Sequence, residues 1–385
     1  MFLSGWNSIQ NGKHSRDFAT YYYANHVTQQ NQNPYETSQL SLAAQQQRTR
    51  KSVHPFFYPP PAILFFTWTS LFSLFTSYQI FFVLNQICMA GILYFGRKWL
   101  QISWLYLLLL ICTFTPLQNS MVMGQVNIFV VLFLLIALRY NNGFALACAG
   151  MIKMSPVYIM FQWIVQKRWK ATIQTIIGAV ILSMIALLIM KFQTQISFYV
   201  DVLPSFASGN YNGLQVPITL PANHSIPDIW NQIFAGKDNH TLSEMAKRIS
   251  SVISISMLAI ILVCSKYWKG EVTSRMLYGA SITLFVITPV YTYEHHLAFI
   301  VIPLMFVMEA WTKYQRKNTY HAVLLMMMYV ALAIPLWMLR SFQGENDIWN
   351  WMVQESKFFA LLFLFFNCLF LAHRYRENSL DEKID

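Results

Sequence analysis

The chain has 385 residues, of which 56% are hydrophobic and 11% are charged, whereas soluble domains carry about 25% charged residues. These proportions exclude an ordinary soluble protein and indicate a membrane protein. The formal net charge of +11 does not indicate nucleic-acid binding, because the basic residues form small clusters between apolar runs instead of one patch.

The first 60 residues are polar and contain no apolar run long enough for a membrane span or a cleavable signal peptide. We expect residues 1–60 to form an external loop that no transmembrane helix precedes. Within it, residues 16–36 are rich in tyrosine and asparagine and carry an isolated acid, Asp17. Two interpretations of Asp17 are open. It is either a catalytic base at the membrane surface or a helix cap, a position that Asp favours.

After residue 60 the chain becomes a succession of apolar runs separated by short polar turns. A spanning helix needs about 20 mostly apolar residues. Residues 61–77 fall short of this length, so we expect a juxtamembrane or re-entrant helix there. The runs that we expect to cross the membrane are residues 78–96, 99–116, 126–138, 171–190, 249–265, 276–290, 295–311, 320–340 and 355–372.

The run over residues 143–165 is long enough to cross, but Lys153 and Pro156 lie at its middle. A lysine at the centre of a bilayer costs about 2.5–3.5 kcal/mol even on the lenient insertion scale, and a proline there removes a backbone hydrogen bond. Basic residues flank both ends of the run. We therefore expect two half-helices that meet at the sequence KMSP, with both ends of the run on one side of the membrane.

This tracing places nearly every short basic cluster on one face, which is the cytoplasmic face by the positive-inside rule. The loops that carry polar motifs fall on the other face. The expected fold class is an all-α polytopic membrane protein with external juxtamembrane helices and loops. The segments that follow are an external loop (1–60), the first part of a helical bundle (61–190), an external loop with a surface helix near 226–236 (191–248), the second part of the bundle (249–372) and a cytoplasmic tail (373–385).

Three further polar features fall on the external face beside Asp17. The sequence GQVN, with Gln125 and Asn127, is either part of a site or simply a helix start capped by Asn. Lys153 either snorkels to water or has a function, which is the default for an ionisable residue at membrane depth. In the third feature, YEHH, His295 and His296 are adjacent instead of four residues apart as in a helical zinc site, and we expect no metal.

These landmarks and their order resemble glycosyltransferase family 87, the polyprenyl-phosphate-mannose-dependent mannosyltransferases with the type C glycosyltransferase (GT-C) fold. The resemblance covers roughly residues 15–312. The matching motifs are Asp17-Phe18, Asn33-Pro34-Tyr35, Phe57-Tyr58-Pro59-Pro60, Asn119, Gly124-Gln125, Asn127, Lys153, Pro156, Thr288-Pro289 and His295-His296.

The resemblance implies that Asp17 is the catalytic base and that His295 or His296 also takes part in the reaction. It implies a polyprenyl-phosphate-linked sugar as donor, with no further cofactor. Cations would then stabilise the departing phosphate, and we expect Lys153 in this role. The residues expected to support it at the donor phosphate are Gln125 and Asn127, and those expected to contact the sugar or the acceptor are Tyr35, Tyr58 and Glu294.

The expected activity is transfer of mannose or another sugar to a lipid or glycan acceptor, with inversion. It would take place on the extracytoplasmic face of the plasma (inner) membrane, with membrane lipids as the other partners. A transporter or flippase for a lipid-linked sugar remains the alternative, since it would share the broken helices and the charge at membrane depth. Such a protein should contain inverted repeats, and none is visible in the sequence.

Overall fold

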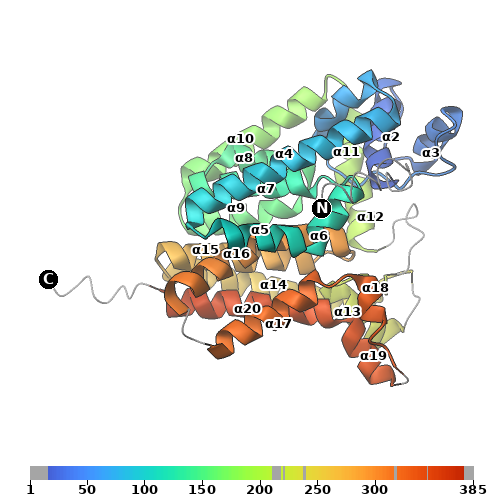
Figure 1. Ribbon diagram of the computed structural model, residues 1–385. Coiled ribbons are helices and arrows are strands. Elements are labelled where there is room, and N and C mark those ends of the chain that lie inside the picture. The colour runs from blue at the N-terminus through green and yellow to red at the C-terminus, as the bar shows by residue number, and fades with distance from the viewer. Residues whose placement is uncertain are drawn as a thin grey trace.

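The computed structural model describes residues 16–209, 218–219, 222–236, 240–315, 319–344 and 346–376. Within these ranges the regular elements are helices, and the long ones run side by side in two groups (Figure 1). Five described helices are long and apolar enough to cross a membrane, and a bent pair raises the number to six. The prediction of an all-α polytopic membrane protein is confirmed.

The first group consists of α4 (Leu74–Leu100), α7 (Asn127–Tyr140), α8 (Gly143–Ile152) and α10 (Trp169–Ala186). Helix α8 lies between α7 and α10, and α7 also packs on α4. Gly143 allows the close approach of α8 to α10, because a Cβ atom there would lie 2.1 Å from a backbone oxygen of α10.

The run over residues 143–165 is interrupted at Lys153, between α8 and the pair η2 (Ser155–Val157) and α9 (Tyr158–Val165). The Arg168 side chain, which follows α9, bonds to the Asn141 side chain, which precedes α8. The two ends of the run therefore lie together, and Lys153 lies at the tip of the hairpin between them.

The second group consists of α14 (Glu244–Tyr267), α15 (Glu271–Ile287), α16 (Val301–Ala310), α17 (Thr319–Ala333) and α20 (Ser356–Arg374). Helix α15 is at its centre, packed against α14, α16 and α20, and α17 covers α20 from outside. Nearly all of α15 is buried, which explains why a helix shorter than a full span is stable inside the bundle.

Two elements join the groups. Helices α5 (Trp104–Thr113) and α6 (Thr115–Val122) form the bent pair, with an angle of 58° between them. The short helix η4 (Glu294–Ile300) packs against both α6 and α7. Of the nine expected spans, those over 99–116, 126–138, 276–290 and 320–340 correspond to helices that are bent or too short to cross alone.

Within the segment expected to be an external loop, the described residues from 16 on form two helices, α2 (Arg16–Gln29) and α3 (Thr37–Gln46). The 3₁₀-helix η1 (Pro60–Leu71) follows them, where a juxtamembrane helix was expected. Helix α2 is buried on every side, and its Tyr21 ring stacks on Phe66 of η1 with centroids 4.4 Å apart. A helix that is enclosed all round shows no contrast between a polar and an apolar face, so periodicity does not reveal it.

The remaining short helices gather mostly at one end of the bundle, on the right in Figure 1, with α2 and α3. They include α13 (Ile226–Ala235), which occupies the place of the expected surface helix near 226–236. The others are α11 (Phe192–Ser197), η3 (Phe198–Val202), α12 (Leu203–Ala207), η5 (Trp311–Gln315), α18 (Leu336–Arg340) and α19 (Asp347–Gln354).

Candidate active site

The Asp17 carboxylate lies in the first turn of α2 and contacts the turn between α6 and α7. Its Oδ2 atom accepts a hydrogen bond of 2.7 Å from the Gln125 side-chain amide. The Gln125 carbonyl oxygen lies 2.9 Å from the Tyr21 hydroxyl and 3.2 Å from the Tyr58 hydroxyl, and Tyr21 also donates to Tyr58 at 2.6 Å, so the protons of the two hydroxyls are shared among these three oxygens. Hydroxyl donors on this side fix which end of the amide is the oxygen, so its NH₂ group faces Asp17.

Both tyrosines remain protonated donors at neutral pH. Burial raises the pKa of Tyr21 well above its ordinary value, and the neighbouring Tyr58 and the Asp17 charge raise it further. Burial likewise raises the pKa of Tyr58, with a smaller contribution from Asp17. The arrangement therefore holds Gln125 in one orientation over the whole physiological range of pH.

Gly124 explains how the turn reaches α2. Its φ angle is +71°, a left-handed conformation that favours glycine. A Cβ atom at this position would lie 2.7 Å from Cβ of Phe18 and 3.0 Å from the ring of Tyr78. Only glycine lets the backbone approach α2 closely enough for Gln125 to contact Asp17.

Asn127 connects two further predicted residues. Its side-chain NH₂ group donates to the backbone oxygen of His295 at 2.7 Å, and its carbonyl oxygen accepts a bond of 2.8 Å from Nζ of Lys153. The Lys153 ammonium also lies 5.6 Å from the centre of the Phe299 ring. Asn127 begins α7 and is itself fully buried, so it holds the KMSP hairpin and η4 together.

The two histidines differ in their surroundings. The Nδ1 atom of His296 accepts a hydrogen bond from the backbone N–H of Tyr293 and thereby caps η4. The His295 ring lies half-buried against the rings of Tyr293 and His296, and within the described part of the chain its nitrogens have no hydrogen-bond partner. The His295 ring is therefore the one available to a ligand.

Asp17, Lys153 and His295 converge although they lie far apart in the sequence. The Asp17 charge acts on both Lys153 and His295, and the Lys153 charge acts on both histidines. The three side chains come from α2, the tip of the KMSP hairpin and the start of η4. We call them the Asp17 cluster. It lies at the start of α7, at the opposite end of this helix from Arg139.

The described residues contain no group of three His, Cys, Asp or Glu side chains placed to hold a metal ion. The chemistry that the Asp17 cluster offers is that of one carboxylate, one ammonium and one imidazole. A carboxylate is suited to removing a proton from a hydroxyl, and the two nitrogen groups are suited to an anion.

The family model for glycosyltransferase family 87 matches residues 56–335. The chain belongs to glycosyltransferase family 87. This confirms the family that the motifs predicted, and the protein is a membrane glycosyltransferase. The matched residues differ from the range of roughly 15–312 that carries the motifs: the match begins after α2, the helix that contains Asp17, and it includes α17. No curated protein and no solved structure matches the chain.

In this glycosyltransferase, several predicted contact residues are already bonded to the protein. Tyr35 is 5% exposed and donates its hydroxyl to the backbone oxygen of Tyr58 at 3.0 Å. Gln125 and Asn127 use their amides to orient Asp17 and Lys153. Tyr58, half-buried beside Asp17, is the predicted sugar contact that keeps an open face. The structure thus gives Tyr35, Gln125 and Asn127 positioning roles.

Glu294 differs most from its predicted role as a sugar contact. It is 7% exposed, and both of its carboxylate oxygens are engaged. Oε1 lies 2.9 Å from Nε2 of His224, and Oε2 lies 2.8 Å from Nζ of Lys357. Burial lowers the pKa of His224 against the opposing effect of Glu294, so the imidazole is a neutral donor. We call these three residues the Glu294 triad.

The sequence analysis did not identify two members of this triad, His224 and Lys357. Lys357 lies in the run over 355–372, so the rule that singled out Lys153 as an ionisable residue at membrane depth applied to it equally. His224 lies in the sequence Asn223-His224-Ser225, and this sequence has the Asn-X-Ser/Thr pattern of a glycosylation acceptor. Asn223 is fully buried and donates to the backbone oxygens of Ile218 and Val290, so it is no surface acceptor.

Proposed function

We propose that this glycosyltransferase moves a sugar from a polyprenyl-phosphate-linked donor to a hydroxyl of a lipid or glycan acceptor. The proposed site is the Asp17 cluster, on the extracytoplasmic face of the plasma membrane. The observation that carries the proposal is the convergence of the Asp17 carboxylate, the Lys153 amine and the unoccupied His295 imidazole from three distant segments.

The proposed step is a single displacement. The Asp17 carboxylate removes the proton of the acceptor hydroxyl as its oxygen bonds to the anomeric carbon. The bond from that carbon to the phosphate oxygen breaks, and the electron pair leaves with the polyprenyl phosphate. Lys153 and His295 face the negative charge that develops on this leaving group. Burial lowers the pKa of His295 to about 4, so its neutral ring would act as an N–H donor, and burial lowers the pKa of Lys153 to about 7 against the opposing effect of Asp17. Preorganised donors and charges of this kind often supply the largest part of transition-state stabilisation.

We expect inversion at the anomeric carbon, because the described residues offer no second free carboxylate for a double displacement. The carboxylates that act on His295 are those of Asp17 and Glu294, and both oxygens of Glu294 are bonded within the triad. The Gln125 amide leaves the second oxygen of Asp17 open to the acceptor. One carboxylate is enough for a base, whereas retention with a covalent intermediate needs a second.

The test is transfer from a radiolabelled polyprenyl-phosphate sugar by the purified full-length protein. Asp17→Asn should lower the rate by at least about a hundredfold, because a positioned base contributes 10²–10⁴-fold. Asp347→Asn is the matched control, since Asp347 is exposed in α19 and should keep the normal rate. Near-normal turnover by Asp17→Asn would remove Asp17 from its proposed role. A transporter would move the donor without loss of label from the lipid.

The face of the membrane needs a separate test. A membrane-impermeant thiol reagent added to intact cells should label a cysteine placed at Gln30, which is exposed after α2, and should not label one placed at Lys98. Labelling of Lys98→Cys alone would put the Asp17 cluster in the cytosol and end the proposal for an extracytoplasmic reaction.

A further inference from the structure

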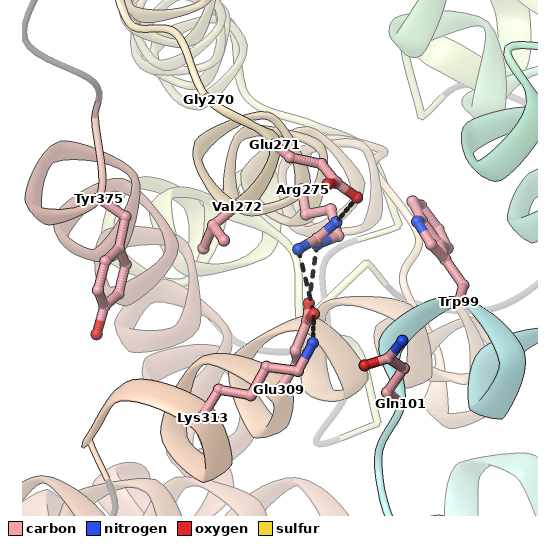
Figure 2. A pocket seen from close by; sticks show the side chains of 9 residues that line it. All are labelled: Trp99, Gln101, Gly270, Glu271, Val272, Arg275, Glu309, Lys313 and Tyr375. Atoms are coloured by element: carbon pink, nitrogen blue, oxygen red, sulfur yellow. Dashed lines mark hydrogen bonds and ion pairs between the residues drawn. The ribbon is translucent and has the colours of Figure 1, made fainter.

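Two adjoining cavities lie at the end of the bundle opposite the Asp17 cluster. Their volumes are about 340 and 500 Å³, and Trp99 and Arg275 border both. Trp99 belongs to α4 of the first helix group and Arg275 to α15 of the second, so the cavities lie between the two groups. Figure 2 shows Trp99 facing Arg275 across this space.

Arg275 is neutralised by its neighbours. Its Nε atom lies 2.8 Å from Oε2 of Glu309, it bonds to Glu271 one turn away, and Glu309 also pairs with Lys313 at 2.9 Å (Figure 2). Glu309 is 1% exposed and Arg275 is 5% exposed. These ion pairs hold Arg275 in place where it lines both cavities.

The larger cavity has two other guanidinium groups without such partners, from Arg139 and Arg168. Arg139 donates to the backbone oxygen of Phe95 at 3.0 Å, and Arg168 donates to the side chains of Asn141 and Ser274. Within the described residues, neither lies within ion-pair distance of a carboxylate. The lining of the larger cavity thus contains three guanidinium groups and a single carboxylate, that of Glu271.

Two half-buried guanidinium groups with neutral partners leave positive charge uncompensated beside this open cavity. Guanidinium groups match the oxygens of a phosphate with paired hydrogen bonds. Leu138, Tyr278 and Trp99 contribute apolar or aromatic surface to the cavity, and Asn141 and Ser274 contribute polar side chains. The cavity lies at the basic end of membrane helices. Basic pockets between helices at such positions bind anionic lipid head groups.

We propose that the larger cavity binds the phosphate head group of an anionic phospholipid, with Arg139 and Arg168 as its ligands. The head group would lie between α7 and α15 and so connect the two helix groups. Free phosphate compounds share this chemistry. The location at the ends of membrane helices favours a lipid, whose acyl chains remain in the bilayer.

The experiment reconstitutes the full-length protein with equal amounts of phosphatidylglycerol and phosphatidylcholine, re-extracts it and measures the retained lipids by mass spectrometry. The wild type should retain phosphatidylglycerol in preference by about twenty-five-fold, since each of the two arginines near an anionic surface contributes roughly fivefold. Equal retention of the two lipids by the wild type would overturn the proposal without the use of any variant.

The variant Arg139→Gln/Arg168→Gln should lose this preference. Lys98→Gln/Lys170→Gln is the matched control, because it removes two charges from exposed residues at the same end of the bundle, outside the cavity. Equal loss in both variants would show a general charge effect and overturn the assignment. If the glutamine variant fails to fold, Arg139→Lys/Arg168→Lys keeps the charge and should still reduce the preference.

A second arm separates a lipid from a soluble compound. Glycerol 3-phosphate and inorganic phosphate, added at millimolar concentration during extraction, should leave phosphatidylglycerol bound. Displacement of the lipid by either compound would assign the cavity to a soluble phosphate ligand and refute the lipid assignment.

Discussion

Replacement of Lys357 by methionine tests the Glu294 triad, because the change keeps the length of the side chain and removes its charge. Lys357 is fully buried, and its ammonium lies 2.8 Å from Glu294. Among the described residues, Lys357 is the only lysine or arginine within ion-pair distance of that carboxylate. After the substitution, Glu294 keeps a neutral imidazole, that of His224, as its hydrogen-bond donor.

The expected loss of stability follows from the burial of the pair. Removing one partner of a buried ion pair costs about 3–5 kcal/mol, because the other charge stays buried and uncompensated. The bond from His224 to Glu294 survives, so we expect Lys357→Met to cost about 3 kcal/mol, at the lower end of that range. Glu294→Gln leaves the lysine uncompensated and should cost a similar amount.

The assay is unfolding of the purified protein in mixed micelles with increasing dodecyl sulfate. The double variant Glu294→Gln/Lys357→Met buries no charge at this point, and its loss should be smaller than the sum of the single losses by at least about 1 kcal/mol. Lys266→Met serves as the control, since Lys266 is exposed at the end of α14. Additive single losses, or a loss below about 1 kcal/mol for Lys357→Met, would refute the reasoning.

Three other predictions concern separate parts of the protein. Gly124→Ala should lower stability by about 1–3 kcal/mol, since it combines a positive φ with a clash on Phe18, and an unchanged melting temperature would contradict this. Asn127→Ala frees Lys153 and should raise the KM for the donor and lower transfer by about tenfold or more; wild-type kinetics would show that the bond has no positioning role. Burial, and to a lesser extent the charge of a neighbouring carboxylate, raises the pKa of Asp228 from 3.8 to about 9. The folded state therefore binds the extra proton between these values, and stability should fall as pH rises through this window. Asp228→Asn should flatten the profile of melting temperature between pH 5 and 8.5, and an equally steep profile in the variant would exclude Asp228 as its source.

The class of fold could be predicted from the sequence because hydrocarbon thickness and charge placement are strong constraints. The interruption at Lys153 could be predicted for the same reason, since a lysine and a proline oppose a continuous span. The number of spanning helices could not. Helix α15 has 17 residues and is almost entirely buried by other helices, so it does not need the length of a helix that faces lipid.

Helix α2 shows where pattern analysis failed. Its tyrosines suggest a polar loop, yet Tyr21 and Tyr23 are fully buried and their hydroxyls bond within the protein. Tyrosine buries a large apolar ring when its hydroxyl finds a partner. That partner for Tyr21 is Gln125, about a hundred residues away in the chain, and no local pattern contains such information.

The residues of the candidate site could be predicted from the sequence, but the separate role of each residue could not be predicted. Asp17, Lys153 and His295 were all named, and the structure brings them together. His296 caps η4 and Asn127 bonds to Lys153. Both contacts depend on the backbone geometry at the start of a helix. The charge on Lys357 was equally visible in the sequence, but its partner Glu294 is 63 residues away.

The position of Lys357 late in the chain has a consequence for biosynthesis. The segment that carries His295 is translated and inserted well before the last membrane helix leaves the ribosome. Until that helix docks, the Glu294 carboxylate has no lysine to pair with, and the position of the neighbouring His295 ring is not fixed. The nascent enzyme should therefore be silent while it is still being made, and sugar transfer should begin only when the final helix has entered the bilayer.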